Sequence, residues 1–294
     1  MEAYLTEFFS FLKNEKCASM STQQSYRRDL NAYCDYLMQK NTEHLFSVKQ
    51  ELVQEYLSLL EHQGKAGTTV ARNLASIRAM YQYFEEKGLL EENPTKGLHI
   101  DRGEKKIPKI LTSLEVELLL DQPKAVDSKG CRDKAMLELL YATGIRVSEL
   151  IALNVDDLNL KERYVRCGEG EHERRIPLYE TAVQCLSDFL KKVRPYLVYS
   201  YDEYALFVNC NGKRFSRQGF WKIVRYYRNM AGFKKEITPQ ILRQSFAIHL
   251  LENGADIRSM QQMMGHSNIS TTQGYAKIAK ERIRDVYHRT HPRA

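Results

Sequence analysis

The sequence lacks the features that would place the chain in a membrane or outside the cell. Its 294 residues contain no apolar run close to the roughly 18 residues that a membrane span requires. The first eleven residues carry Glu2 and Glu7 in place of a basic leader segment. The six cysteines are scattered without a C-x-x-C pair, and no metal-ligand cluster is visible. We therefore expect a cytoplasmic protein with reduced thiols, no membrane association, no cofactor and no metal ion.

The positive charge of the chain is unevenly distributed. The formal net charge is +7, but residues 1–210 hold 28 basic and 32 acidic side chains, whereas residues 211–294 hold 16 basic and 5 acidic ones. A basic segment of this kind is typical of proteins that bind a polyanion, and nucleic acid is the commonest polyanion inside cells. A solvated basic surface without a partner is the alternative interpretation.

The apolar pattern predicts two domains. Between residues 4 and 87, apolar side chains recur at three- and four-residue steps, which indicates four amphipathic helices and an all-α domain over residues 1–98. Residues 99–110 combine basic charge with no apolar period and are interpreted as a linker. The sequence Thr112-Ser113-Leu114-Glu115 is typical of a capping box, so a second domain is expected over residues 111–294.

The second domain is predicted to be mainly helical with one small sheet. Two short strands at 164–167 and 175–178 are joined by the turn Gly168-Glu169-Gly170. The helices are expected at 132–141, 147–153, 182–193, 218–230, 239–253 and 257–264.

Four segments of the second domain resemble the signature boxes of the tyrosine site-specific recombinases. Residues 142–150 (ATGIRVSEL) are similar to the first arginine box and residues 242–251 (LRQSFAIHLL) to the second. Residues 264–267 (MGHS) are similar to the histidine box and residues 271–275 (TTQGY) to the nucleophile box. Four boxes in family order are far more specific than any one of them.

The resemblance is to recombinases of the Xer type and covers nearly the whole chain. It implies a mainly α fold, in which an N-terminal four-helix core-binding (SAM-like) domain clamps DNA and precedes an α+β catalytic domain with a small sheet. The basic, amphipathic segment at 279–291 resembles the family's C-terminal helix, which docks into a neighbouring protomer and regulates cleavage.

The resemblance also implies a catalytic set made of Arg146, Arg243, His266 and Tyr275. Two forked guanidiniums suit the charge that develops on a phosphodiester under attack, and His266 would donate a further hydrogen bond. Tyr275 would form a 3′-phosphotyrosyl bond, which conserves the energy of the broken strand without ATP or a metal ion. Taken singly, Arg146 beside Glu149 is more typical of an ion pair.

Two proton-handling positions depart from the family. The turn that usually reads Gly-Lys-Gly, with a lysine that protonates the leaving 5′ oxygen, has Glu169 here. The position three residues before the second arginine, usually His or Lys, is Gln240, and Gln244 also replaces a residue that is often His. General acid and base groups contribute about 10²- to 10⁴-fold each, so these changes predict slow cleavage.

Two interpretations of this departure remain open at the level of sequence. Glu169 either points toward the phosphate, where it would repel it, or turns to solvent or toward Arg174 or Arg175. His172 or Arg174, on the same turn, would be a substitute proton donor.

Other basic residues are predicted to contact DNA phosphates or the major groove. They are Arg27, Arg28, Arg72 and Arg78 in the first domain, Lys105 and Lys106 in the linker, and Lys213, Arg214, Arg217, Arg225 and Arg228 in the second domain.

The leading hypothesis is a recombinase or integrase that binds double-stranded DNA at a specific site and forms a tetramer on two paired sites, alone or with a related recombinase. The alternative is a catalytically impaired relative that binds the same DNA as a regulator or accessory protein. A type IB topoisomerase-like enzyme is disfavoured because the sequences of the boxes are similar to those of Xer recombinases.

Overall fold

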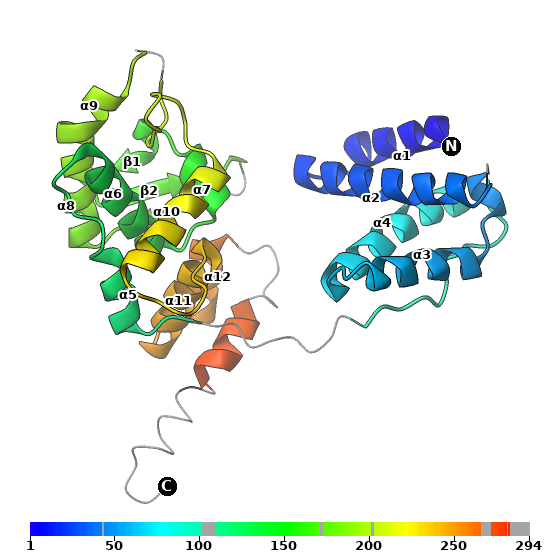
Figure 1. Cartoon of the computed structure of the whole chain (residues 1–294). Helices are drawn as coiled ribbons and strands as arrows, with labels where there is room; N and C mark the ends of the chain where they lie inside the picture. The colour runs from blue at the N-terminus through cyan, green and yellow to red at the C-terminus, as the bar shows by residue number, and fades with distance from the viewer. Residues whose placement is uncertain are drawn as a thin grey trace, which may run out of the picture. The chain divides into compact units, whose positions relative to one another are not determined.

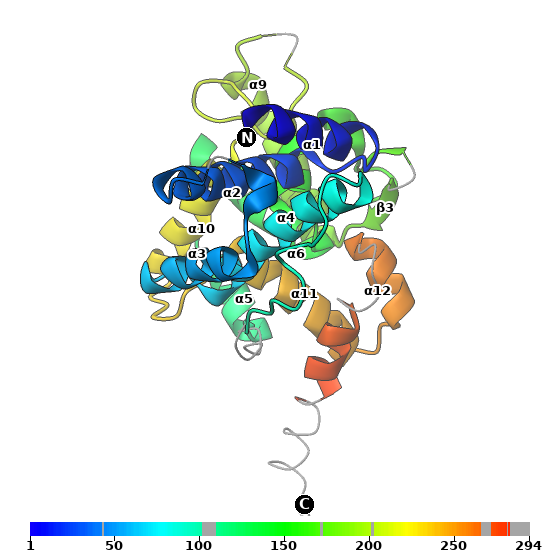
Figure 2. The same cartoon turned by 90° about the vertical axis from the view of Figure 1, so that its right-hand side faces the viewer.

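The computed structural model describes residues 1–42, 44–101, 110–170, 173–200, 203–265, 272–280 and 282. The chain divides into two compact units, Met1–Lys106 and Ile107–Ala294. Both units are dominated by helices, as Figures 1 and 2 show. None of the described helices is long and apolar enough to cross a membrane.

The first unit contains the four predicted helices. They are α1 (Glu2–Asn14), α2 (Met20–Gln39), α3 (Gln50–His62) and α4 (Gly67–Glu86), with the short 3-10 turn η1 (Leu45–Ser47) between α2 and α3. The aromatic side chains of these helices form the core: Phe8, Tyr33, Tyr81 and Phe84 are fully buried. The hydroxyl groups of Tyr33 and Tyr81 lie 3.1 Å apart, so each polar atom taken from water has a partner.

The second unit places a small antiparallel sheet among helices. Its N-terminal helices are α5 (Ser113–Leu120), α6 (Ser128–Thr143) and α7 (Val147–Ala152), and the 3-10 turn η2 (Val155–Asp157) follows them. The sheet has the order β1-β2-β3, formed by β1 (Leu158–Asn159), β2 (Tyr164–Cys167) and β3 (Arg174–Pro177). The remaining elements are α8 (Glu180–Asp188), the π-helical turn η4 (Phe189–Val193), α9 (Arg194–Leu197), α10 (Arg217–Met230), α11 (Pro239–Glu252) and α12 (Ile257–Met264), and residues 272–280 are also helical.

Helix α6 is the centre of this unit because it is buried on almost every side. Leu137, Leu139 and Leu140 are fully buried, and α6 packs against both α8 and α11 (Figure 1). The predicted capping box before α5 is present, with reciprocal bonds between Thr112 and Glu115. A smaller cluster that includes Phe246, Met260 and Met264 lies beside the main core and holds the C-terminal end of the described chain.

The fold class is as predicted, and the differences are local. Strand β3 begins at Arg174 instead of residue 175, so Arg174 and Ile176 face inward while Arg175 and Pro177 are exposed. Strand β1 has only two residues, too few to form a pattern in the sequence. The single helix expected over 182–193 begins at Glu180 and changes to a π-helical turn at Phe189, where that side chain stacks on Phe207 with ring centroids 5.3 Å apart.

A buried histidine links the protonation of the second unit to its folding. His249 on α11 is 8% exposed; its Nε2 donates to the carbonyl of Leu111 at 2.9 Å, and its Nδ1 lies 2.9 Å from the Tyr141 hydroxyl. Because burial lowers the pKa of His249, the unfolded state binds more protons than the folded state as the pH falls.

We expect the contribution of His249 to the free energy of unfolding to be fully present above the ordinary histidine pKa. The free energy of unfolding should then decrease as the pH falls from about 7 to about 5. His249→Gln keeps a donor and an acceptor but does not titrate, so its unfolding free energy should depend less on pH over this range. Urea denaturation at both pH values measures the effect, with the exposed His62→Gln as the control. An unchanged pH dependence in His249→Gln would contradict this account.

Candidate active site

The first arginine of the site is presented by a glycine turn between two helices. Helix α6 ends at Gly144, which adopts a left-handed conformation with φ +59°, and Arg146 then caps α7. The Arg146 side chain is 44% exposed and donates from Nη2 to the carbonyl of Gly265 at 2.8 Å. Arg146 is therefore held in place while it still faces solvent.

The second arginine is buried on α11. Arg243 is 3% exposed, and its guanidinium donates to the carbonyls of Gly144 and Met264, the latter at 2.7 Å. Burial, together with the positive charge of Arg146, lowers the pKa of Arg243 to about 10. The group therefore remains protonated at neutral pH, as a charge with little water around it.

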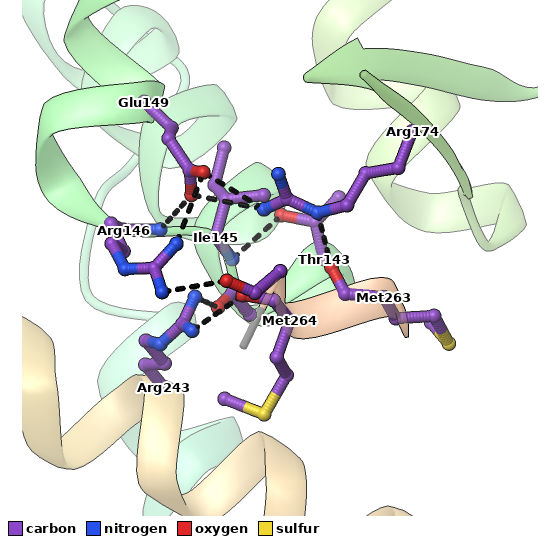
Figure 3. Close-up of polar contacts among 10 residues, drawn as sticks. Thr143, Ile145, Arg146, Glu149, Arg174, Arg243, Met263 and Met264 are labelled. Atoms are coloured by element: carbon purple, nitrogen blue, oxygen red, sulfur yellow. Dashed lines mark hydrogen bonds and ion pairs between the residues drawn. The ribbon is translucent and has the colours of Figure 1, made fainter. Parts of the chain in front are cut away.

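Glu149 connects the first arginine box to the sheet, as Figure 3 shows. Its carboxylate accepts from the Arg146 backbone N–H at 2.7 Å and from Arg146 Nη1 at 3.3 Å. It also accepts from Arg174 Nη2 at 3.0 Å. The ion pair that the sequence suggested for Arg146 is thus present, and it forms part of a larger cluster.

Three arginines meet the last carbonyls of α12. Arg174 Nε donates to Met263 at 2.7 Å, and the next two carbonyls, those of Met264 and Gly265, accept from Arg243 and Arg146 (Figure 3). The carbonyls at the end of a helix have no partner within the helix and carry partial negative charge. The arginine cluster therefore fixes the chain at the point from which it continues to the histidine box.

Tyr275 lies in the electrostatic field of this cluster. The side chain is 6% exposed and packs with Phe246, Met260 and Met264. Burial raises the pKa of its phenol, whereas the charges of Arg243 and Arg146 and a hydrogen bond from Gln244 act to lower it. The structure therefore brings both arginine boxes and the tyrosine of the nucleophile box together, and His266 lies outside the described residues.

An open cleft with a volume of about 1380 Å³ runs along the exposed side of the cluster. Arg146, Glu149, Glu169, Arg174 and Arg258 are among the residues that line it. Glu169 is exposed, and no ion pair among the described residues includes it, so the arrangement in which it pairs with Arg174 or Arg175 is not present. Gln240 is exposed in the first turn of α11, and His172 lies outside the described residues.

The predicted DNA contacts of the second unit divide into exposed and structural residues. Lys213, Arg217 and Arg225 are exposed and Arg228 is half-buried. Arg214 instead donates to the carbonyls at the end of α7 and to Asn154 Oδ1, so it caps that helix. Nothing in the sequence around Arg214 signals this structural role.

The arginines of the first unit divide in the same way. Arg28 is exposed, and the exposed Arg27 lies 4.5 Å over the Phe9 ring. Arg72 pairs with the buried Asp29, and Arg78 donates to the carbonyl of Leu98 at 2.5 Å. Lys105 and Lys106 lie outside the described residues.

Sequence reasoning missed the position that Arg174 occupies. It treated this arginine as a substitute proton donor, but a guanidinium keeps its proton in proteins, and Arg174 Nε and Nη2 are bonded to protein acceptors. Arg174 therefore acts as a structural connection between β3, α7 and α12. The period-two alternation of β3, with Ile176 inward, is the signal that would have placed it inside.

A mainly helical unit with a small sheet, in which two arginines from separate helices lie beside a buried tyrosine, is the arrangement of a tyrosine recombinase catalytic domain. Residues 109–282 match the model of the phage integrase family, and residues 5–88 match the phage integrase N-terminal SAM-like domain. The chain belongs to the phage integrase family.

Two tyrosine recombinases match along the entire chain. The tyrosine recombinase XerD of Staphylococcus epidermidis (strain RP62A) is 42% identical over 295 residues, and that of Staphylococcus aureus (strain Mu50) is 41% identical, each with all of both chains covered. These relatives support membership of the Xer-like group within the family.

Solved structures share the fold. The XerA recombinase is 25% identical and has a TM-score of 0.56, covering 100% of this chain and 99% of its own. The XerH recombinase bound to a palindromic difH substrate has a TM-score of 0.77 at 20% identity, covering 96% of this chain and 83% of its own. The Tn1549 transposon integrase with transposon right end DNA has a TM-score of 0.76 at 21% identity, covering 97% of this chain and 98% of its own.

The turn that presents Arg146 depends on glycine for two reasons. Besides the left-handed φ of Gly144, a Cβ atom at this position would lie 2.2 Å from Cδ1 of Phe246. We expect Gly144→Ala to lower the free energy of unfolding by about 2–5 kcal/mol, from backbone strain and overpacking together. Urea denaturation measures this loss.

Gly170 is the matched control for Gly144. It has a similar φ of +54°, but a Cβ atom at this position would meet open space, with no other atom within 4 Å. Gly170→Ala should therefore lose only about 1–2 kcal/mol, from backbone strain alone. Equal losses in the two variants would show that the contact with Phe246 has no energetic role.

Proposed function

We propose that this chain is a site-specific recombinase that cuts and rejoins DNA strands through a 3′-phosphotyrosyl bond to Tyr275. The observation that carries the proposal is the convergence of Arg146, Arg243 and Tyr275 from three separate segments of the chain. Membership of the phage integrase family and full-length similarity to XerD recombinases support the same function.

The two arginines suit different parts of the phosphate-binding task. Arg243 is buried and its donors are directed by the carbonyls of Gly144 and Met264, so its charge needs little reorganisation when a phosphate arrives. Arg146 is partly exposed on the cleft and can exchange the Gly265 carbonyl for a phosphate oxygen. Together with His266, they would stabilise the charge on the nonbridging oxygens during attack.

The proton-transfer groups are the part of the site that we propose to be altered. Glu169 replaces the family lysine on the turn that lines the cleft, and Gln240 replaces the family histidine or lysine. A carboxylate has no proton to give to the leaving oxygen, and the amide of glutamine does not accept one from the phenol, so both proton transfers depend on water or on other groups. Cleavage would therefore be slower than in a recombinase with both groups, and the comparisons give no support to a purely regulatory role.

Helix α10 supplies the proposed contact with double-stranded DNA. Its inner face buries Phe220, Val224 and Tyr227, while Arg217 and Arg225 are exposed on the outside. Exposed guanidiniums on one helix suit phosphate and groove contacts. Structural neighbours of this fold include XerH bound to difH and a lambda integrase dimer bound to a core site, which supports DNA as the partner.

The assembly and the domain roles are also part of the proposal. Residues 1–98 would clamp the DNA, residues 99–110 would link the two domains, and residues 111–294 would contain the catalytic site and the C-terminal exchange helix. Four protomers on two paired sites, identical or shared with a related recombinase, would carry out strand exchange in the cytoplasm.

A nicked suicide substrate tests the proposal directly. The target site is first selected from random DNA with the full chain, and a nick is then placed near the cleavage position so that the cut strand cannot be resealed. We expect a covalent protein–DNA band on a denaturing gel that is lost in Tyr275→Phe. Specific binding without such a band in the wild type, and in the variants below, would contradict recombinase activity.

Restoring the family residues tests the role of the two departures. Glu169→Lys and Gln240→His should each raise the single-turnover cleavage rate by about 10-fold or more, because each restores a proton-transfer group. Glu173→Lys is the control for charge, because Glu173 is also exposed and lines the same cleft. A similar increase in Glu173→Lys would assign the effect to net charge and not to proton transfer.

The pH dependence of cleavage follows from the environment of Tyr275. Because burial raises the pKa of its phenol, the nucleophilic phenolate is scarce at neutral pH, and the single-turnover rate should increase between pH 7 and pH 9. In Gln240→His, an imidazole with an ordinary pKa near 6.5 would accept the proton, so the profile should flatten above about pH 7. Quenched-flow rates at saturating DNA measure both profiles, and a flat wild-type profile would contradict this mechanism.

A further inference from the structure

Arg174 occupies an unusual position for an arginine. It lies on the inward face of β3, where its side chain is only 8% exposed, whereas Arg175, the next residue, is exposed and lies 5.1 Å over the ring of Tyr164. A charged side chain is rarely buried unless it is paired, because the loss of hydration is costly. The contacts of Arg174 must therefore account for its burial.

Those contacts join three separate elements. Arg174 Nη2 bonds to the Glu149 carboxylate on α7 at 3.0 Å, and Arg174 Nε bonds to the Met263 carbonyl at the end of α12 at 2.7 Å. The same carboxylate holds the backbone and the side chain of Arg146. The orientation of Arg146 is consequently linked to β3 through a single carboxylate.

Gly265 makes the contact with α12 closer still. It ends α12 with φ +60°, and a Cβ atom there would lie 2.8 Å from Cζ and 2.9 Å from Nη1 of Arg174. Any side chain at this position would therefore displace the guanidinium from its place against the turn. In the sequence, Gly265 is followed directly by His266 of the histidine box.

We propose that Arg174 is a positioning residue for the cleavage reaction. It acts on Arg146 through Glu149, and on the segment that leads to His266 through Met263 and Gly265. This inference rests on the proposed function, since it assigns Arg174 the task of holding Arg146 and the end of α12 in the arrangement in which Arg146 meets the phosphate. Preorganisation of this kind lowers the reorganisation needed during the reaction, and a displacement of about 1 Å can cost on the order of 10²-fold in rate.

Arg174→Lys is the decisive variant. Lysine keeps the positive charge, which avoids an unpaired Glu149, but its single ammonium cannot bond in both directions of the guanidinium fork. We expect Arg174→Lys to bind the selected DNA with a Kd within about twofold of the wild type. Its single-turnover rate on the suicide substrate at saturating DNA should fall by about 30- to 100-fold.

Arg175→Lys is the matched control, because it makes the same replacement at the adjacent position of β3 on the exposed face. Its rate and its Kd should both stay within about twofold of the wild type. The melting temperature of each variant shows that the comparison is made on folded protein.

A double-mutant cycle tests the route through Glu149. Glu149→Gln weakens the same link from the other side, so it should slow cleavage, and its combination with Arg174→Lys should be little slower than the slower single variant. Rate losses that multiply independently would overturn the route through Glu149.

Two other results would overturn the positioning role itself. The first is an Arg174→Lys variant that cleaves at the wild-type rate. The second is a loss of rate that only follows a loss of DNA affinity or of melting temperature, since this would make the residue merely structural.

Failure of the proposed function has a different signature, the absence of a covalent band in the wild type. In that case, amide hydrogen exchange decides the inference. The Gly265 N–H, which bonds to the Gln262 carbonyl at 3.1 Å, should exchange at least about 10-fold faster in Arg174→Lys at unchanged melting temperature. Equal exchange in wild type and variant would overturn the inference.

Discussion

The site depends on the meeting of buried positive charge with the carbonyl end of a helix. Arg243 has almost no access to water, and its buried charge is compatible with folding because the carbonyls of Gly144 and Met264 accept hydrogen bonds from it. These carbonyls come from the end of α6 and the end of α12. One desolvated guanidinium on α11 therefore holds together the two turns that lead to Arg146 and to the histidine box.

The charge balance of the cluster indicates what it is suited to bind. Arg146, Arg174 and Arg243 contribute three positive charges, and Glu149 compensates one of them. Neutral carbonyls also accept hydrogen bonds from all three arginines without cancelling their charge. The cluster therefore keeps an excess of positive charge that is partly buried, at Arg243 and Arg174, and partly exposed on the cleft, at Arg146. In the proposed function, this excess would favour a phosphodiester and still more the additional negative charge of its transition state.

The sequence predicted the parts of this arrangement that follow local rules. Helix periods, the capping box at Thr112 and the four boxes led to the fold class and to the tyrosine. It did not predict contacts that join distant segments, such as the cap that Arg214 places on α7 or the pair of Arg72 with Asp29. An arginine has the same appearance in a sequence whether it faces DNA, a carboxylate or a helix end, so its partner is known only after the chain has folded.

The inward orientation of Arg174 is a contact that the sequence analysis missed, although the alternation of the strand could have predicted it. The strand was expected to begin one residue later, so Arg174 was assigned to the preceding turn and the alternation of the strand was not extended to it. Pairing of Cys167 with Arg174 and of Val165 with Ile176 determines the true register, and this pairing depends on the partner strand. Beginning the expected strand one residue late was thus enough to leave Arg174 on the turn as a substitute proton donor, although it lies at the centre of a network.

The proposed function assigns charge stabilisation and proton transfer to different kinds of position. The arginines of the cluster are anchored by at least two elements each, whereas Glu169 and Gln240 lie exposed at a turn and in the first turn of a helix. Exposed positions tolerate substitution because nothing packs against them, while loss of a buried guanidinium would leave several carbonyls without partners. A substitution at either exposed position would therefore leave the arginine cluster intact, whereas a substitution in the cluster would also disturb the fold, because the cluster joins the ends of α6 and α12 to α7 and β3.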